Sequence, residues 1–140
     1  MEQEKNAAFS LSAEELEFCI SALQLEIETV EHAMHDKNAT LEERIACTSY
    51  IRSLNALQDE FLRENNSFRS IDLLQVYELV TQERDYLNDA MDDDAIPLDL
   101  RQEGRDHLRT ANNIMRKLKK YFKAFDIDVS SLQQQKADAL

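Results

Sequence analysis

The chain of 140 residues contains a single glycine, Gly104, and a single proline, Pro97. Phosphate-binding loops, and the frequent turns of β-sandwiches and barrels, need several such residues because only glycine adopts positive φ freely. The sequence therefore excludes glycine-rich nucleotide sites and turn-rich β folds. With 43% hydrophobic and 31% charged residues, the chain still has enough apolar side chains for a core. We predict one all-α domain.

The formal net charge of −12 is unevenly distributed. Residues 116–123 contain five positive charges, so the remainder of the chain carries −17. An acidic surface of this kind repels nucleic acid and anionic membranes and favours basic partners. No apolar run approaches the roughly 18–20 residues of a membrane span, and the first residues do not resemble a signal peptide. We expect a cytoplasmic protein that binds neither membrane nor nucleic acid directly, with Cys19 and Cys47 as reduced thiols.

The hydrophobic pattern predicts four amphipathic helices. Apolar residues recur every three or four positions in four stretches, Leu16–Met34, Leu41–Phe61, Leu73–Met91 and Leu98–Phe125, with Leu41, Ile45 and Thr48 opening the second stripe. Ser12-Ala13-Glu14-Glu15 and Thr40-Leu41-Glu42-Glu43 read as capping boxes, and Ser70 as a further N-cap. Short connections make neighbouring helices antiparallel, which predicts an up-down-up-down four-helix bundle.

These signals predict the domain organisation of the chain. We expect a flexible N-terminal arm over residues 1–11 and a weakly ordered tail over 127–140. Between them, one bundle over 12–126 is built from two hairpins, residues 12–66 and 70–126. The second helix is expected to end near Asn65 and Asn66.

The two hairpins resemble each other in sequence. At an offset of 57 residues, 16–61 align with 73–118 without a gap, and nine positions are identical, among them Glu26/Glu83, Asp36/Asp93, Arg44/Arg101, Arg52/Arg109 and Asn55/Asn112. This pattern indicates a duplicated helical hairpin, with coincidence between two amphipathic hairpins as the alternative. The expected register places Arg52 near Glu26 and Arg109 near Glu83, so we predict an ion pair across each hairpin.

Two positions interrupt the pattern of the second hairpin. Arg84 takes the stripe position that Ile27 holds in the first, so it is expected to pair with a carboxylate, extend to solvent or line an interface. Gly104 lies within the fourth helix, where glycine costs about 1 kcal/mol relative to alanine. A close helix contact, a kink or simple tolerance would each account for it.

Candidate chemistry in the sequence is sparse. Glu28, His32 and His35 share one side of the first helix with a spacing that suits metal ligands. The acidic residues flank the apolar stripe and no Glu-x-x-His motif is present, so we assign no metal ligand and no cofactor. His107 lies level with Glu83 as an acid/base couple, but nothing nearby supplies a nucleophile or an oxyanion site. We predict no catalytic residue and a protein that is not an enzyme.

The leading hypothesis is a non-enzymatic interaction module, an adaptor or regulator that binds a partner protein through a helical face. Charge favours a basic partner, and a homodimer is a further option. The interaction positions proposed from the sequence are Arg52, Asn55, Arg109, Asn112, Arg116, Lys119, Lys120 and Lys123. Two alternatives stay open: an acidic nucleic-acid mimic that inhibits a DNA- or RNA-binding protein, and a carboxylate/His metal-binding bundle.

Overall fold

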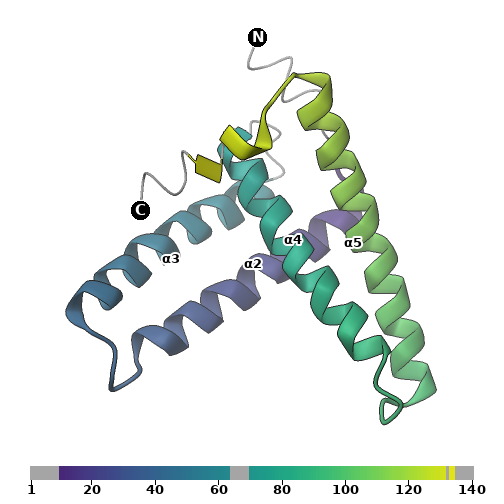
Figure 1. Cartoon of the computed structure of the whole chain (residues 1–140), viewed down its shortest axis with the longest axis horizontal. Coiled ribbons are helices and arrows are strands. Elements are labelled where there is room, and N and C mark those ends of the chain that lie inside the picture. The colour runs from purple at the N-terminus through teal and green to yellow at the C-terminus, as the bar shows by residue number, and fades with distance from the viewer. Residues whose placement is uncertain (1–9, 64–69, 132, 135–140) are drawn as a thin grey trace.

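The structure is a computed structural model that describes residues 10–63, 70–131 and 133–134. It contains four long helices, α2 (Ala13–Met34), α3 (Leu41–Leu62), α4 (Ser70–Met91) and α5 (Leu98–Ala124). Successive helices run in alternating directions, as Figure 1 shows, and none of the described residues forms a strand. The predicted all-α four-helix fold is confirmed. The arm expected over 1–11 and the helix end expected at Asn65 and Asn66 fall largely or wholly outside the described residues.

The predicted helix starts are set by local hydrogen bonds. Ser12 and Glu15 form the expected capping box: the Ser12 hydroxyl accepts from the Glu15 amide at 3.2 Å, and the Glu15 carboxylate accepts from the Ser12 amide at 2.8 Å. Thr40 accepts from the Glu43 amide at 3.1 Å, which is the hydroxyl half of the second box. Helix α4 begins at Ser70, the residue expected as its cap.

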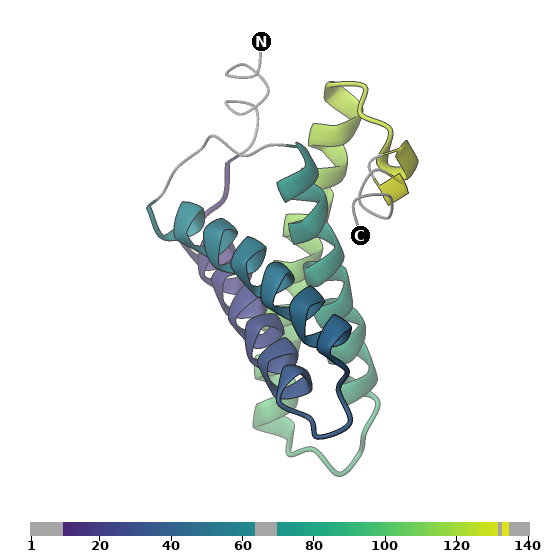
Figure 2. The ribbon, with the colours of Figure 1, turned by 90° about the vertical axis from the view of Figure 1, so that its left-hand side faces the viewer.

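The hairpins α2–α3 and α4–α5 meet mainly through α2, which crosses both helices of the second hairpin (Figures 1 and 2). Their connecting loops point to different corners of the molecule (Figure 1). Only the second half of α3 reaches the shared core, so Leu54, Leu57 and Phe61 are buried. The prediction that the first half of its stripe is also buried is wrong: Leu41 and Ile45 are 74% and 60% exposed, and Thr48 is exposed too. The second hairpin diverges before it can cover them.

The repeat is visible in the backbone. Helices α2 and α4 begin and end 57 residues apart, and so do the starts of α3 and α5. In both loops an aspartate accepts from the amide two residues later: Asp36 from Asn38 at 2.8 Å, and Asp93 from Ala95 at 2.9 Å. The matched arginines Arg44 and Arg101 also hydrogen-bond to these loops.

Arg44 donates to the Asp36 carbonyl at 3.4 Å, and Arg101 donates to the carbonyls of Asp94 and Ile96 at 3.2 and 2.9 Å. The identities at the aspartate and arginine positions are therefore explained by loop structure and need no ligand. Two tandem helical hairpins, as predicted, make up the fold.

The two irregular positions of the second hairpin have local explanations. A Cβ atom at Gly104 would overlap the terminal Cε of Met91, so this glycine allows a close contact near the second loop. Arg84 is half-buried and pairs with the adjacent Asp85, its Nε and one terminal nitrogen both bonding one carboxylate oxygen at 3.2 and 3.0 Å.

Candidate functional site

The ion pairs predicted across the hairpins do not form. In the described part of the chain Arg52 and Arg109 are exposed and make no hydrogen bond or ion pair, with Glu26, with Glu83 or with any other residue. Asn55 and Asn112, the other matched interaction positions, are also exposed. The structure leaves all four available at the surface but does not bring them together into one site.

Glu26 instead bonds Tyr50, which lies level with it on α3. The Tyr50 hydroxyl donates to the Glu26 carboxylate at 3.0 Å and accepts from Gln75 of α4, also at 3.0 Å. Burial, and after it the negative charge of Glu26, raises the pKa of the Tyr50 hydroxyl well above its ordinary value of 10.0. This three-residue cluster therefore connects the first hairpin to α4 by hydrogen bonds. The Tyr50 phenol is neutral at physiological pH.

The repeat places different residues at the equivalent positions of the second hairpin. At the offset of 57 residues, Tyr50 matches His107 and Glu26 matches Glu83. Gln75 of α4 matches Phe18 of α2. His107 and Glu83 form no hydrogen bond with each other; the nearest charge partner of His107 is Glu103 at 3.9 Å, one turn earlier on α5. Where the first hairpin has a closed polar cluster, the second has an open space.

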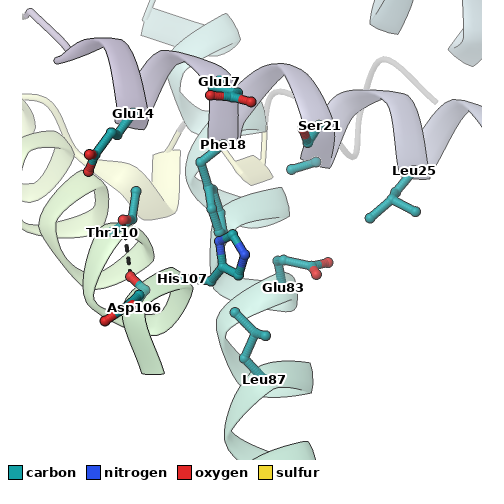
Figure 3. A pocket seen from close by; sticks show the side chains of 11 residues that line it. Glu14, Glu17, Phe18, Ser21, Leu25, Glu83, Leu87, Asp106, His107 and Thr110 are labelled. Atoms are coloured by element: carbon teal, nitrogen blue, oxygen red, sulfur yellow. Dashed lines mark hydrogen bonds between the residues drawn. The ribbon is translucent and has the colours of Figure 1, made fainter. Parts of the chain in front are cut away.

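That space is a cavity of about 330 Å³ at the crossing of α2 with α4 and α5, called here the acidic pocket (Figure 3). Phe18, Leu25 and Leu87 supply much of its apolar wall, and His107 also lines it (Figure 3). Its full lining consists of Glu14, Glu17, Phe18, Ser21, Ala22, Leu25, Glu83, Leu87, Asp106, His107 and Thr110. Four carboxylates and no lysine or arginine surround the apolar wall.

Three of these carboxylates have unused hydrogen-bonding capacity. Within the described residues, Glu14, Glu17 and Glu83 make no side-chain hydrogen bond and no ion pair, whereas Asp106 accepts from Gln102 at 3.4 Å. Glu14 and Glu17 are exposed and Glu83 is half-buried. The pocket therefore combines negative charge at its mouth with apolar surface inside, a combination suited to a cation that carries an apolar group.

Small side chains on α2 create the cavity. Ser21 and Ala22 line it, and the equivalent positions of α4 hold the larger Glu78 and Leu79. Leu79 is buried in the core, and the charge of Glu78 acts on Tyr50. At the positions that match Ser21 and Ala22, α4 thus carries larger side chains than α2.

The basic segment is partly used within the chain. Lys117 forms an ion pair with Glu15 and also donates to the Ser10 carbonyl at 3.3 Å. Burial raises the pKa of Glu15, but the hydrogen bonds from Lys117 and Ser12 outweigh this and hold it below the ordinary 4.5. The candidate positions Arg116, Lys119, Lys120 and Lys123 are exposed, whereas the interleaved Leu118, Tyr121 and Phe122 belong to the core.

A second surface lies on the outer face of α3 near the first loop. Two rows of residues spaced four apart leave a shallow groove between them, called here the α3 groove, which is lined by Leu41, Arg44, Ile45, Thr48, Ser49 and Arg52. Its lining holds two positive charges and no negative one. None of its residues lines the acidic pocket.

No metal centre is assembled in the described residues. His32 and His35 are exposed, and no three histidine, cysteine, aspartate or glutamate side chains come together in a group that would hold a metal. Both cysteines are free. Cys19 is 1% exposed, and burial, with the charge of Glu15, raises the pKa of its thiol to about 12.

Sequence reasoning identified His107 and Glu83 as neighbours but missed the other walls of the pocket. Phe18 and Leu25 lie beside the apolar stripe of α2, so periodicity alone did not mark them. The available signal was the repeat itself, in which Ser21 and Ala22 are smaller than their counterparts Glu78 and Leu79.

None of the helices in the described part of the chain combines the length and the apolarity that a membrane crossing requires. Comparison with protein-family models, with curated proteins and with solved structures finds no match to this chain.

Proposed function

We propose that this protein is a non-enzymatic binding module that recognises a basic segment of a partner protein in the acidic pocket. The observation that carries the proposal is the composition of that pocket, which has four carboxylates around apolar walls and no lysine or arginine in its lining. An arginine or lysine fits such a site because its aliphatic stem packs on Phe18 and Leu25 while its charged end meets the carboxylates.

The partner segment needs an apolar neighbour as well as a cation. Leu25 is 50% exposed, and Leu87 is half-buried at the same opening. Leucine or a residue of similar size next to the basic side chain would cover both and remove their surface from water. The net charge of −12 adds long-range attraction for a basic partner, which is sensitive to salt. Two free cysteines suit the reducing cytosol that we propose as its location.

The experiment is a titration of the protein with a short labelled peptide in which one arginine is flanked by leucines, followed by fluorescence anisotropy. A peptide with glutamine in place of arginine is the ligand control. We expect saturable binding of the first peptide that weakens as salt is raised, and little binding of the second.

Variants of the protein test the location of the site. Glu17→Gln and Glu83→Gln should each weaken binding about fivefold, as expected for one partly exposed charge contact of about 1 kcal/mol. Glu31→Gln, at an exposed position of α2 outside the pocket, should bind like the wild type. Equal binding by all variants, or equal binding of both peptides, would contradict the proposal.

A further inference from the structure

We propose that a second copy of this chain binds at the acidic pocket of the first copy. The second copy makes this contact with the residues that line its α3 groove. This inference rests on the proposed function because it uses the same pocket. The two surfaces are complementary in charge and in polarity: the groove offers Arg44 and Arg52 beside exposed leucine and isoleucine, and the pocket offers carboxylates around apolar walls.

The α3 groove presents apolar side chains that none of the described residues covers. Leu41 and Ile45 are 74% and 60% exposed. Arg52 is exposed and, among the described residues, makes no hydrogen bond or ion pair. The groove therefore carries a free cation next to apolar surface, which is the chemistry that the acidic pocket fits.

The repeat shows that apolar residues are not required at this place in a hairpin. On α5 the positions equivalent to Ile45, Thr48 and Ser49 are Gln102, Arg105 and Asp106. All three are exposed and polar, and Asp106 also lines the acidic pocket, whereas Leu98, which matches Leu41, is 72% exposed. Of the two apolar residues of the groove, Ile45 is therefore particular to α3, whereas Leu41 has an exposed leucine at the matched position of α5.

The shape of the molecule keeps the two surfaces apart within one copy. The groove lies at the loop end of the first hairpin, and the pocket lies at the crossing of α2 with α4 and α5 (Figures 1 and 3). A contact between two different surfaces is heterologous, so it joins copies head to tail into short chains or a ring. The groove spans about 18 Å of helix, at 1.5 Å per residue, which suits a weak contact that depends on concentration.

The test is sedimentation velocity of the full chain over a range of concentrations. We expect the wild type to associate as its concentration rises. Ile45→Asp, which alters the groove, and Glu17→Lys, which alters the pocket, should each weaken association about tenfold or more. Gln82→Asp, which introduces the same charge at an exposed position of α4 that lines neither surface, should associate like the wild type.

An equimolar mixture of Ile45→Asp and Glu17→Lys supplies the decisive result. One variant keeps an intact pocket and the other an intact groove, so the mixture should recover a species of dimer mass that grows no further. A wild type that stays monomeric, or a mixture that stays monomeric while the wild type associates, would overturn the inference. Peptide binding by a monomeric wild type would leave the proposed function standing, so the two failures are distinguishable.

Discussion

Tyr50 on α3 donates a hydrogen bond of 3.0 Å to Glu26 on α2, a contact that the matched residues of the second hairpin do not make. His107 and Glu83 occupy the same two positions 57 residues later, and both line the acidic pocket. One hairpin thus has a closed contact at these two positions, and the other has two residues that line an open cavity. The candidate site therefore lies where the residues of the two hairpins differ.

Replacing Tyr50 with phenylalanine should destabilise the fold. The substitution leaves the Glu26 carboxylate and the Gln75 amide without the hydroxyl that each bonds, at an expected cost of about 1–2 kcal/mol in the free energy of unfolding. Urea denaturation measures this cost. His107→Phe is the matched control and should change stability by less than about 0.5 kcal/mol, since His107 is exposed. Equal losses in the two variants would contradict a structural role specific to Tyr50.

The ion pair between Glu15 and Lys117 should make stability depend on pH in the acid range. The pKa of Glu15 is lowered in the folded protein, so the unfolded chain binds this proton more readily. The contribution is therefore complete above the ordinary pKa of 4.5 and is lost as pH falls through the folded value.

Denaturation at pH 7 and at successively lower pH compares the wild type with Glu15→Gln. The wild type should be more stable at pH 7, and the difference should shrink as the pH drops below about 4.5. Glu14→Gln, an exposed neighbour in the same turn, serves as control and should show no such trend. A difference that stays constant with pH would show that the charge of Glu15 contributes nothing.

Gly104 should tolerate alanine but not a larger side chain. An added Cβ overlaps the flexible end of Met91, which can rotate away, and alanine gains helix propensity of about 1 kcal/mol. We expect Gly104→Ala to change the free energy of unfolding by less than about 1 kcal/mol. Gly104→Val should lower it by about 2 kcal/mol because branching at Cβ leaves no rotamer that avoids the crowding. Thermal denaturation followed by circular dichroism distinguishes the two; a large loss with alanine would show that Met91 cannot move.

Two residues after α5 ends at Ala124, Asp126 has a left-handed backbone with a φ of 54°. The amide of Ile127 bonds the Phe122 carbonyl at 2.8 Å and the amide of Asp126 bonds the Lys123 carbonyl at 3.2 Å, the hydrogen bonds of a Schellman motif. Asp126→Gly should raise the free energy of unfolding by about 0.5–1 kcal/mol. Asp126→Ala should have a lower free energy of unfolding than Asp126→Gly. Chemical denaturation of the pair checks this; equal stability would exclude strain at this position.

The two cysteines should differ in reactivity. Cys47 is half-buried on α3, whereas Cys19 is 1% exposed with its pKa raised to about 12, so its thiolate is scarce at neutral pH. Iodoacetamide at pH 7.5 should modify Cys47 first and Cys19 only as the protein unfolds, as mass spectrometry of peptides would show. Equal rates in the native protein would contradict the burial of Cys19.

Local signals in the sequence predicted the helices well. The Ser12–Glu15 capping box and the apolar spacing depend on residues a few positions apart, so pattern reading captures them. The crossing of the hairpins depends instead on packing between residues of different hairpins, which periodicity does not encode. For that reason Leu41 and Ile45 were expected in the core and are exposed, and the ion pair expected between Glu26 and Arg52 is replaced by the Tyr50 contact.

The acidic pocket was predictable only in part. The repeat placed His107 opposite Glu83, which the structure confirms as neighbours in one cavity lining. The cavity itself follows from Ala22 being smaller than its counterpart Leu79 at a crossing whose geometry the sequence does not give. Chain-wide comparison of side-chain sizes between repeat copies would have pointed to this position before the structure did.

Nuclear magnetic resonance of isotopically labelled protein gives the most direct test that the acidic pocket is a binding site. Addition of the arginine–leucine peptide should shift the signals of Phe18, Leu25 and Leu87 in a saturable manner, and Ala22→Leu, which fills the cavity with the counterpart residue, should abolish those shifts. Largest shifts along residues 41–52 or 116–123, or no saturable shift at all, would contradict the account.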